Sequence, residues 1–146
     1  MKKEIYLLMF ISLLLFSCKY NATYENDETE KKEAEAVTEK LYKDLEGKDY
    51  LDAEKYFSSK FFQATSKEDL VGIFTKTNEK LGDFKSKNLI DWKTHKIVGS
   101  NPSSEYLLLY EVEYQKHPAR ETIRLIKEKD SIRIIGYNVT SEGFLK

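Results

Sequence analysis

The chain has 146 residues and an almost balanced charge, with 24 Lys and Arg residues against 25 Asp and Glu residues. This balance, without a basic stripe that could follow a phosphate backbone, argues against a nucleic-acid partner. The sequence contains one cysteine and two histidines, and it shows no zinc-ligand cluster, no phosphate-binding loop and no nucleophile elbow.

The first residues have the layout of a secretory signal. Lys2 and Lys3 form a short basic start, and residues 5–16 are apolar apart from Tyr6 and Ser12. Read as a helix, such a run rises about 18 Å, which is short of a hydrocarbon core of roughly 30 Å. Residues 1–17 are therefore predicted to be a signal peptide and not a membrane span.

The single cysteine stands where this apolar run ends. The stretch Leu15-Phe16-Ser17-Cys18 resembles the lipobox of bacterial lipoproteins. The resemblance implies that Cys18 is acylated on its sulfur and becomes the first residue of the mature chain. A thiol suits this role because it is the strongest nucleophile among the side chains. The alternative is a free cysteine in a packed first helix, but such a helix should show a polar face and this run has none.

The lipobox resemblance also implies a location. A lipidated Cys18 places the protein in the cell envelope, anchored to the membrane on the extracytoplasmic side. Lys19 follows the cysteine at the position where an inner-membrane retention signal would place Asp. By resemblance to lipoproteins of cells with two membranes, the outer membrane is favoured where the cell has one.

The mature part has the size of one domain. Removing residues 1–17 leaves 129 residues with 22 Lys and Arg and 24 Asp and Glu. Residues 18–28 are polar and rich in acids, so they are predicted to be the lipidated cysteine and a flexible tether reaching roughly 17 Å. Residues 29–146 are predicted to form a single globular domain. Because the one cysteine is used by the anchor, the hydrophobic core must hold this domain together.

Helical periodicity opens the predicted domain. Apolar residues recur at helical spacing from Thr29, and Gly47 stands where a helix commonly ends. Asp49 could cap a second, shorter helix that turns Leu51 and other apolar side chains inward.

The motif "SKED" at residues 66–69 resembles a capping box and opens a third predicted helix, which Gly82 closes. Gly72 lies inside this helix, where it costs about 1 kcal/mol relative to alanine. We expect it to allow tight packing against a neighbour.

From Phe84 onward the apolar period changes from 3.6 to 2, which indicates strands. Four runs read as strands: "SKNLIDWKTHKIV", "EYLLLYEVEYQK", "ETIRLIKEK" and "IRIIGYNVT". In the second run one face should be core; it carries Tyr106, Leu108, Tyr110, Val112 and Tyr114. Short turns between the runs predict antiparallel neighbours. The predicted class is α+β, with three N-terminal helices packed on a curved four-stranded antiparallel sheet.

This order of elements resembles a known superfamily. Together with "GKDYLDAEKYFSSKFF", "KLGDF" and "IRIIGYNV", it is similar to the nuclear-transport-factor-two-like, or cystatin-like, superfamily over residues 30–140. Within it, the chain resembles small exported lipoproteins of unknown function. The resemblance implies a cone-like sheet, a cystatin-like roll, curled around the first helix with an open end that can form a pocket. Members include ketosteroid isomerases, dehydratases and binding modules, so the fold does not decide the function.

A lyase or isomerase in such a cone needs a general base held in an apolar pocket. Asp91 and His95 are the one pair that could be considered, and they share a strand face about 13 Å apart. That separation is too large for one proton relay, and Lys93 between them indicates a solvated face. We therefore expect no catalytic residues, no metal and no cofactor.

Aromatic residues are the remaining candidates. A ligand pocket could be lined by Tyr106, Tyr110, Tyr114, Trp92 and Tyr137. The alternative is a tyrosine stripe in the core whose hydroxyls are satisfied at its edge. The face expected to be buried shows no carboxylate or imidazole, which argues against an enzyme.

The sequence thus favours a membrane-anchored, non-catalytic binding or interaction module. Its expected partners are the membrane, through the lipid anchor, and a small apolar ligand or an envelope protein, with a homodimer as a further option. The alternative is a ketosteroid-isomerase-like lyase or isomerase that uses the cone pocket.

Overall fold

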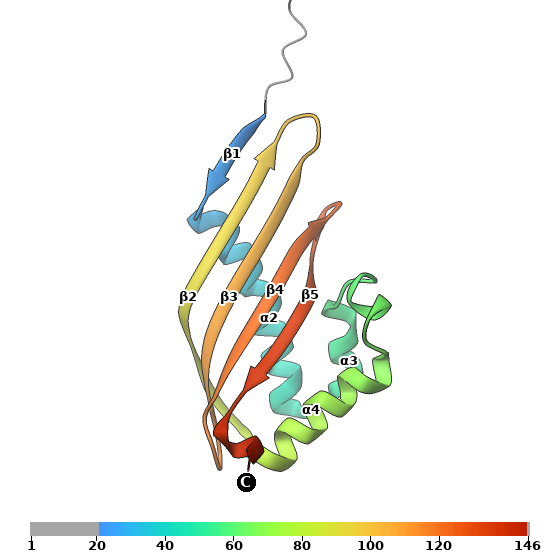
Figure 1. Ribbon diagram of the computed structural model, residues 1–146, viewed down its shortest axis with the longest axis vertical. Helices are drawn as coiled ribbons and strands as arrows, with labels where there is room; N and C mark the ends of the chain where they lie inside the picture. Colours follow the sequence, from blue (N-terminus) through green and yellow to red (C-terminus); the bar gives the residue numbers. More distant parts are fainter. Residues whose placement is uncertain (1–20, 146) are drawn as a thin grey trace, which may run out of the picture.

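The computed structural model describes residues 21–145, which form three α-helices packed against a five-stranded antiparallel sheet (Figure 1). The helices are α2 (Glu28–Gly47), α3 (Tyr50–Ala53) and α4 (Lys67–Leu81). The strands are β1 (Ala22–Glu25), β2 (Phe84–Val98), β3 (Ser103–Tyr114), β4 (Ala119–Glu128) and β5 (Ser131–Thr140), and they lie in that order across the sheet. Three single 3₁₀ turns complete the described part: η2 (Glu54–Tyr56), η3 (Phe61–Gln63) and η4 (Glu142–Leu145). The predicted α+β class is confirmed.

The predicted signal peptide and Cys18 lie outside the described residues. Among residues 21–145, none of the helices combines the length and the apolar character that crossing a membrane requires.

The prediction of four strands is wrong, because β1 is a fifth. It lies in the segment that we expected to be a flexible tether, and it pairs antiparallel with the end of β2. Two further bonds tie this segment down: the backbone N–H groups of Asn26 and Asp27 donate to the carbonyl and hydroxyl oxygens of Thr94, at 2.9 and 2.8 Å. A strand of four mostly exposed residues carries no readable alternation, and its partner lies some seventy residues away along the chain.

Helix α2 begins at a side-chain cap and ends before a residue in the left-handed conformation. The Asp27 side chain caps it by accepting hydrogen bonds from the backbone N–H groups of Thr29 and Glu30. It ends at Gly47, and the left-handed residue that follows is Lys48, with φ 60°. Its buried face packs under the sheet through Ala34, Thr38, Leu41, Tyr42 and Leu45.

The next two helices differ in how well the pattern predicted them. The capping box at the start of α4 is present, with Ser66 and Asp69 each bonding the other's backbone. In α3, by contrast, Asp49 makes no capping hydrogen bond, so the expected cap is wrong. Leu51 is 74% exposed and not turned inward, because a single helical turn has too few residues to define a buried face. Gly72 is exposed, and a Cβ atom there would meet nothing within 4 Å, so the expected tight packing is wrong.

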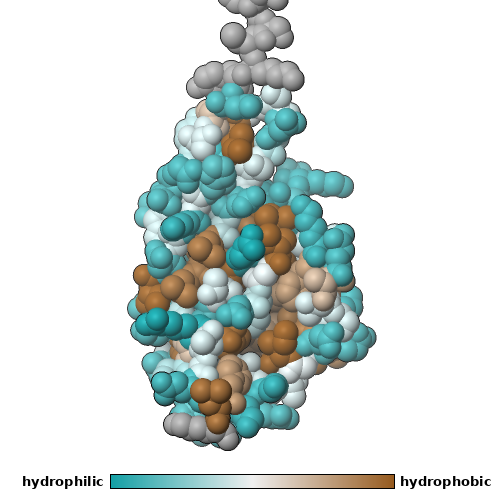
Figure 2. Space-filling view, in the orientation of Figure 1, coloured by the Kyte–Doolittle hydropathy of each residue, from teal (hydrophilic) through white to brown (hydrophobic). Residues whose placement is uncertain are grey.

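The alternation in β3 correctly identifies the core side of the sheet. Its residues alternate strictly between buried and more exposed positions, and the even-numbered ones from Ser104 to Tyr114 face α2. In the view of Figure 1 the sheet lies in front of α2, so Figure 2 presents the outer face, where hydrophobic side chains form separate groups among hydrophilic ones.

A pair of substitutions tests this assignment of faces. Tyr110 is fully buried and its hydroxyl bonds the Thr38 hydroxyl at 2.7 Å. Tyr110→Ala should therefore lower the free energy of unfolding by about 3 kcal/mol or more, because a cavity forms and Thr38 loses its partner. Glu113→Ala, on the outer face of the same strand, should change it by less than about 0.5 kcal/mol. Urea unfolding of both variants measures the difference; equal losses would contradict the assignment.

Candidate functional site

A buried carboxylate lies at the centre of the interior. Glu121 on β4 is fully buried, and its two oxygens accept hydrogen bonds from three tyrosine hydroxyls. Tyr114 donates to Oε1 at 2.5 Å, while Tyr137 and Tyr42 donate to Oε2 at 2.7 and 3.0 Å. The three donors come from β3, β5 and α2, so this one side chain joins four elements.

The expectation that the buried face carries no carboxylate is therefore wrong. Glu121 has the same strand parity as Ile123 and Leu125, which are also buried, and this parity is the signal that could have identified it. A glutamate at such a position is normally solvated unless it is paired. Here the tyrosines supply the pairing, which the local sequence around β4 does not display.

Burial and hydrogen bonding act on Glu121 in opposite directions. Burial raises the pKa of the Glu121 carboxyl above its ordinary value, and the hydrogen bonds from Tyr114, Tyr137 and Tyr42 only partly offset this effect. Burial and the nearby carboxylate raise the pKa of each of these three tyrosines as well. The hydroxyls therefore stay protonated and remain donors across the physiological range.

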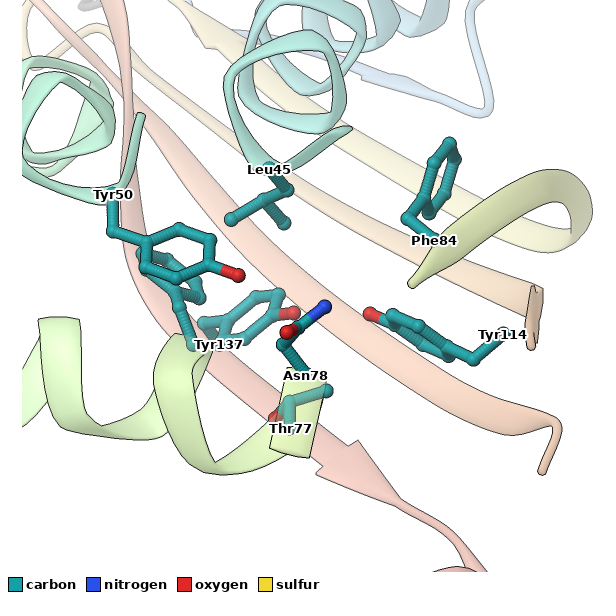
Figure 3. A pocket seen from close by; sticks show the side chains of 8 residues that line it. Leu45, Tyr50, Thr77, Asn78, Phe84, Tyr114 and Tyr137 are labelled. Carbon is teal, nitrogen blue, oxygen red and sulfur yellow. The ribbon is translucent and has the colours of Figure 1, made fainter. Parts of the chain in front are cut away.

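Beside this cluster lies a small cavity of about 10 Å³ (Figure 3). The hydroxyl groups of Tyr50, Tyr114 and Tyr137 point toward it, and the Asn78 amide reaches it from α4. The rest of its wall is formed by Leu45, Phe74, Thr77 and Phe84. A space of this size corresponds to about one water molecule. It has no room for an organic substrate.

A larger groove of about 270 Å³ opens on the surface nearby. It shares Thr77 and Tyr137 with the small cavity, and it runs between α4 and the second half of β5. Ile73, Val139 and Phe144 make most of its wall apolar, and polar groups come from Lys76 and Asn138. This groove, and not the interior, offers space for a partner.

A second buried acid lies under the β1 end of the sheet. Glu30 on α2 accepts hydrogen bonds from the Lys96 ammonium and, at 2.7 Å, from the Tyr106 hydroxyl. Burial acts to raise the pKa of Glu30, but the bonds from Lys96 and Tyr106 outweigh it and lower the pKa overall. Glu30 is therefore a charged, fully paired structural group.

The structure does not bring Asp91 and His95 into the interior. Asp91 is exposed and accepts a hydrogen bond from the backbone N–H of the following residue, Trp92. His95 is 44% exposed at its side chain and contacts Glu25 across the β1–β2 pair. With exposed Lys93 between them, both residues lie on the solvated outer face, as the sequence predicted.

The five aromatic candidates separate into different surroundings. Tyr114 and Tyr137 line the small cavity, whereas Tyr106 bonds Glu30 and Tyr110 bonds Thr38. Trp92 is half-buried with the Lys31 ammonium 4.9 Å from its ring centroid. All four of these tyrosine hydroxyls thus have partners inside the protein, which agrees with the reading of a satisfied core stripe.

Comparison of the chain with protein-family models, with curated proteins and with solved structures gave no match. Within residues 21–145, His, Cys, Asp and Glu side chains form no group of three or more that could hold a metal ion. The likeness to the nuclear-transport-factor-two-like superfamily therefore stays a prediction from the sequence motifs.

The raised pKa of Glu121 predicts a pH dependence of stability. When the pKa of an acid is higher in the folded state than in the unfolded state, its protonated form favours folding. This contribution to stability is complete below the unfolded-state pKa of about 4.3 and is lost as pH rises through the folded-state pKa. Glu121→Gln resembles the neutral acid but does not titrate. Relative to this variant, the wild type should lose stability as pH rises above about 4.3, by about 1.4 kcal/mol for each unit by which the folded-state pKa exceeds the unfolded one.

Urea unfolding of both proteins between pH 4 and pH 9 measures this difference. The exposed Glu113→Gln variant is measured in parallel as the control for removing one surface carboxylate. A wild-type stability that rises relative to Glu121→Gln with increasing pH would contradict the raised pKa.

Proposed function

We propose that this chain is a membrane-anchored extracytoplasmic lipoprotein whose α+β domain acts as a non-catalytic binding or interaction module. The lipobox-like residues 15–18 after the apolar run support the anchor. The superfamily resemblance over residues 30–140, with its cone-like sheet, is compatible with a binding role but does not require it.

The main support for a non-catalytic function is that side chains fill the interior of the domain. Glu121 is fully buried and three tyrosines occupy its oxygens, while the adjoining cavity measures about 10 Å³. A small ligand bound inside the domain would need a cavity of much larger volume. The interior therefore favours a protein partner, bound at the surface, over a small apolar ligand held in a cone pocket.

The position of β1 adds a geometric argument. Ala22 begins this strand, four residues after Cys18, and four residues span at most about 14 Å when fully extended. A lipidated Cys18 would therefore hold the β1 end of the sheet close to the membrane surface. The end near α4 and the C-terminus lies at the opposite extreme of the long axis (Figure 1) and would face away from the membrane.

A ketosteroid-isomerase-like lyase or isomerase remains the second candidate, because Glu121 is a buried carboxyl with a raised pKa beside a small cavity lined by tyrosines. Such an environment suits a general base. Against it, a substrate could reach Glu121 only after the hydroxyl of Tyr114 or Tyr137 had moved away.

The anchor can be tested by metabolic labelling with an alkyne-bearing fatty acid. The wild type should be labelled, and Cys18→Ala should not, because no other side chain supplies the thiol. The unlabelled variant should remain an uncleaved precursor or become soluble outside the inner membrane. Ser17→Ala keeps a small residue before the cysteine and should still be labelled. Equal labelling of the wild type and Cys18→Ala would contradict the anchor.

The two functional candidates make opposite predictions for Glu121→Gln. For an interaction module, a membrane-impermeant, lysine-reactive cross-linker applied to cells expressing the full chain should give a discrete adduct with an envelope protein. The adduct should be unchanged in Glu121→Gln, because that side chain is buried. For an isomerase, the wild type should speed deuterium incorporation at the α-carbon of cyclic ketones in D₂O, and Glu121→Gln should lose this activity. Such a loss, without an adduct, would favour the enzyme.

A further inference from the structure

The second half of β5 is an open strand edge. β5 is the last strand of the sheet and pairs with β4 on one side. Within residues 21–145, the backbone hydrogen bonds outside helices and strand ladders include Ile134 but none of residues 135–140. In an antiparallel strand, alternate residues point their N–H and C=O groups away from the neighbour. The edge at residues 135–140 therefore presents backbone donors and acceptors that no other part of residues 21–145 pairs with.

The surface groove runs along this same edge. The groove is lined by Tyr137 and Val139 of β5, by Ile73 and Lys76 of α4, and by Phe144 of η4. A strand edge and a helix thus flank an apolar space of about 270 Å³. This combination of open backbone and side-chain pockets is what an extended peptide requires when it adds to a sheet.

We infer that an extended segment of a partner protein adds to β5 as a sixth strand and places apolar side chains in the groove between β5 and α4. The inference rests on the proposed interaction function and assigns its binding surface. Extension follows from the free backbone groups, and apolar character follows from Ile73, Val139 and Phe144. An acidic residue of the segment would lie against Lys76, which is exposed and pairs with no carboxylate within residues 21–145.

The chain's own backbone already pairs with this edge at one position. Phe57 forms a parallel bridge with Ile134, and the Ser58 N–H donates to the Ile134 carbonyl oxygen at 2.8 Å. An extended piece of the protein's own backbone therefore docks on β5 just before the open part begins. The partner segment would continue this pairing toward Thr140.

The opposite edge of the sheet is unsuited to the same role. β1 pairs only with residues 95–98 of β2, so the earlier part of β2 is also an edge. That part contains a bulge between Leu89 and Asp91 and carries Lys85, Lys87 and Lys93. Bulges and lysines protect an edge against pairing. By contrast, residues 136–140 of β5, "GYNVT", carry no charge.

The test uses the full-length chain purified in detergent and a phage-displayed library of random octapeptides as the probe. Recovered peptides are synthesised, and their affinity is measured by fluorescence anisotropy. Peptides that add as a strand should slow amide hydrogen exchange at residues 136–140. Ile73→Glu should weaken binding at least tenfold, because it places a charge in the groove wall. Ile90→Glu, the same change at an exposed isoleucine on β2, should leave binding unchanged.

A surface variant keeps the test valid if Ile73→Glu disturbs the fold. Lys76→Glu should weaken peptides that contain an acidic residue by about three- to tenfold, whereas Lys40→Glu, an exposed lysine on α2, should not. Recovery of no binding peptide, protection elsewhere than residues 136–140, or unchanged affinity in both groove variants would overturn the inference.

Protection of residues 136–140 that grows with protein concentration in the absence of peptide would instead assign the edge to a second copy of the chain and overturn the partner segment. These failures leave the proposed function separately testable. An envelope adduct that persists in Ile73→Glu and Lys76→Glu would retain the interaction module and reject this surface.

Discussion

Burial of the Glu121 carboxyl is the constraint on which the interior depends. A carboxyl taken out of water must find hydrogen-bond partners, because burying it without partners destabilises the fold by several kcal/mol. Here the partners are the hydroxyls of Tyr42, Tyr114 and Tyr137, so the requirement fixes where α2, β3 and β5 lie relative to β4. Apolar burial could be satisfied by several slightly different packings, but three hydrogen bonds to two oxygens are satisfied by few of them. The cluster thus restricts how the helix can lie on the sheet.

The same cluster limits the chemistry of the interior. A general base must be both shifted in pKa and within reach of a proton on the substrate. Glu121 meets the first condition, because burial raises its pKa, but its oxygens are occupied and the nearby cavity measures about 10 Å³. Moving a tyrosine aside would leave a buried polar group unpaired at a cost of about 1 to 3 kcal/mol before any substrate contact formed. A buried acid with a shifted pKa can therefore be a structural group, and its reach distinguishes it from a catalytic one.

The features that the sequence could predict are those whose interacting residues lie close together along the chain. The alternation of β3 and the capping box of α4 are local, so the core face around Tyr110 and the start at Ser66 were predictable. The partners of Glu121 lie 79, 7 and 16 positions away, and β1 pairs with residues about seventy positions on. No local pattern carries such pairings. Leu51 was misplaced for a different reason, since the single turn of α3 is too short for helical periodicity to define a buried face.

The strand β1 connects the fold to the proposed anchor in a way that the expected tether would not. A flexible tether of ten residues would let the domain take many orientations above the membrane, with a mean reach of roughly 17 Å. Because β1 starts at Ala22, only residues 19–21 would separate a lipidated Cys18 from the sheet. An anchored domain would then keep the β1 end toward the membrane and the α4 end away from it (Figure 1). The open edge of β5 beside α4 would therefore be presented to other proteins of the envelope, while the protected edge of β2 runs back toward the anchor.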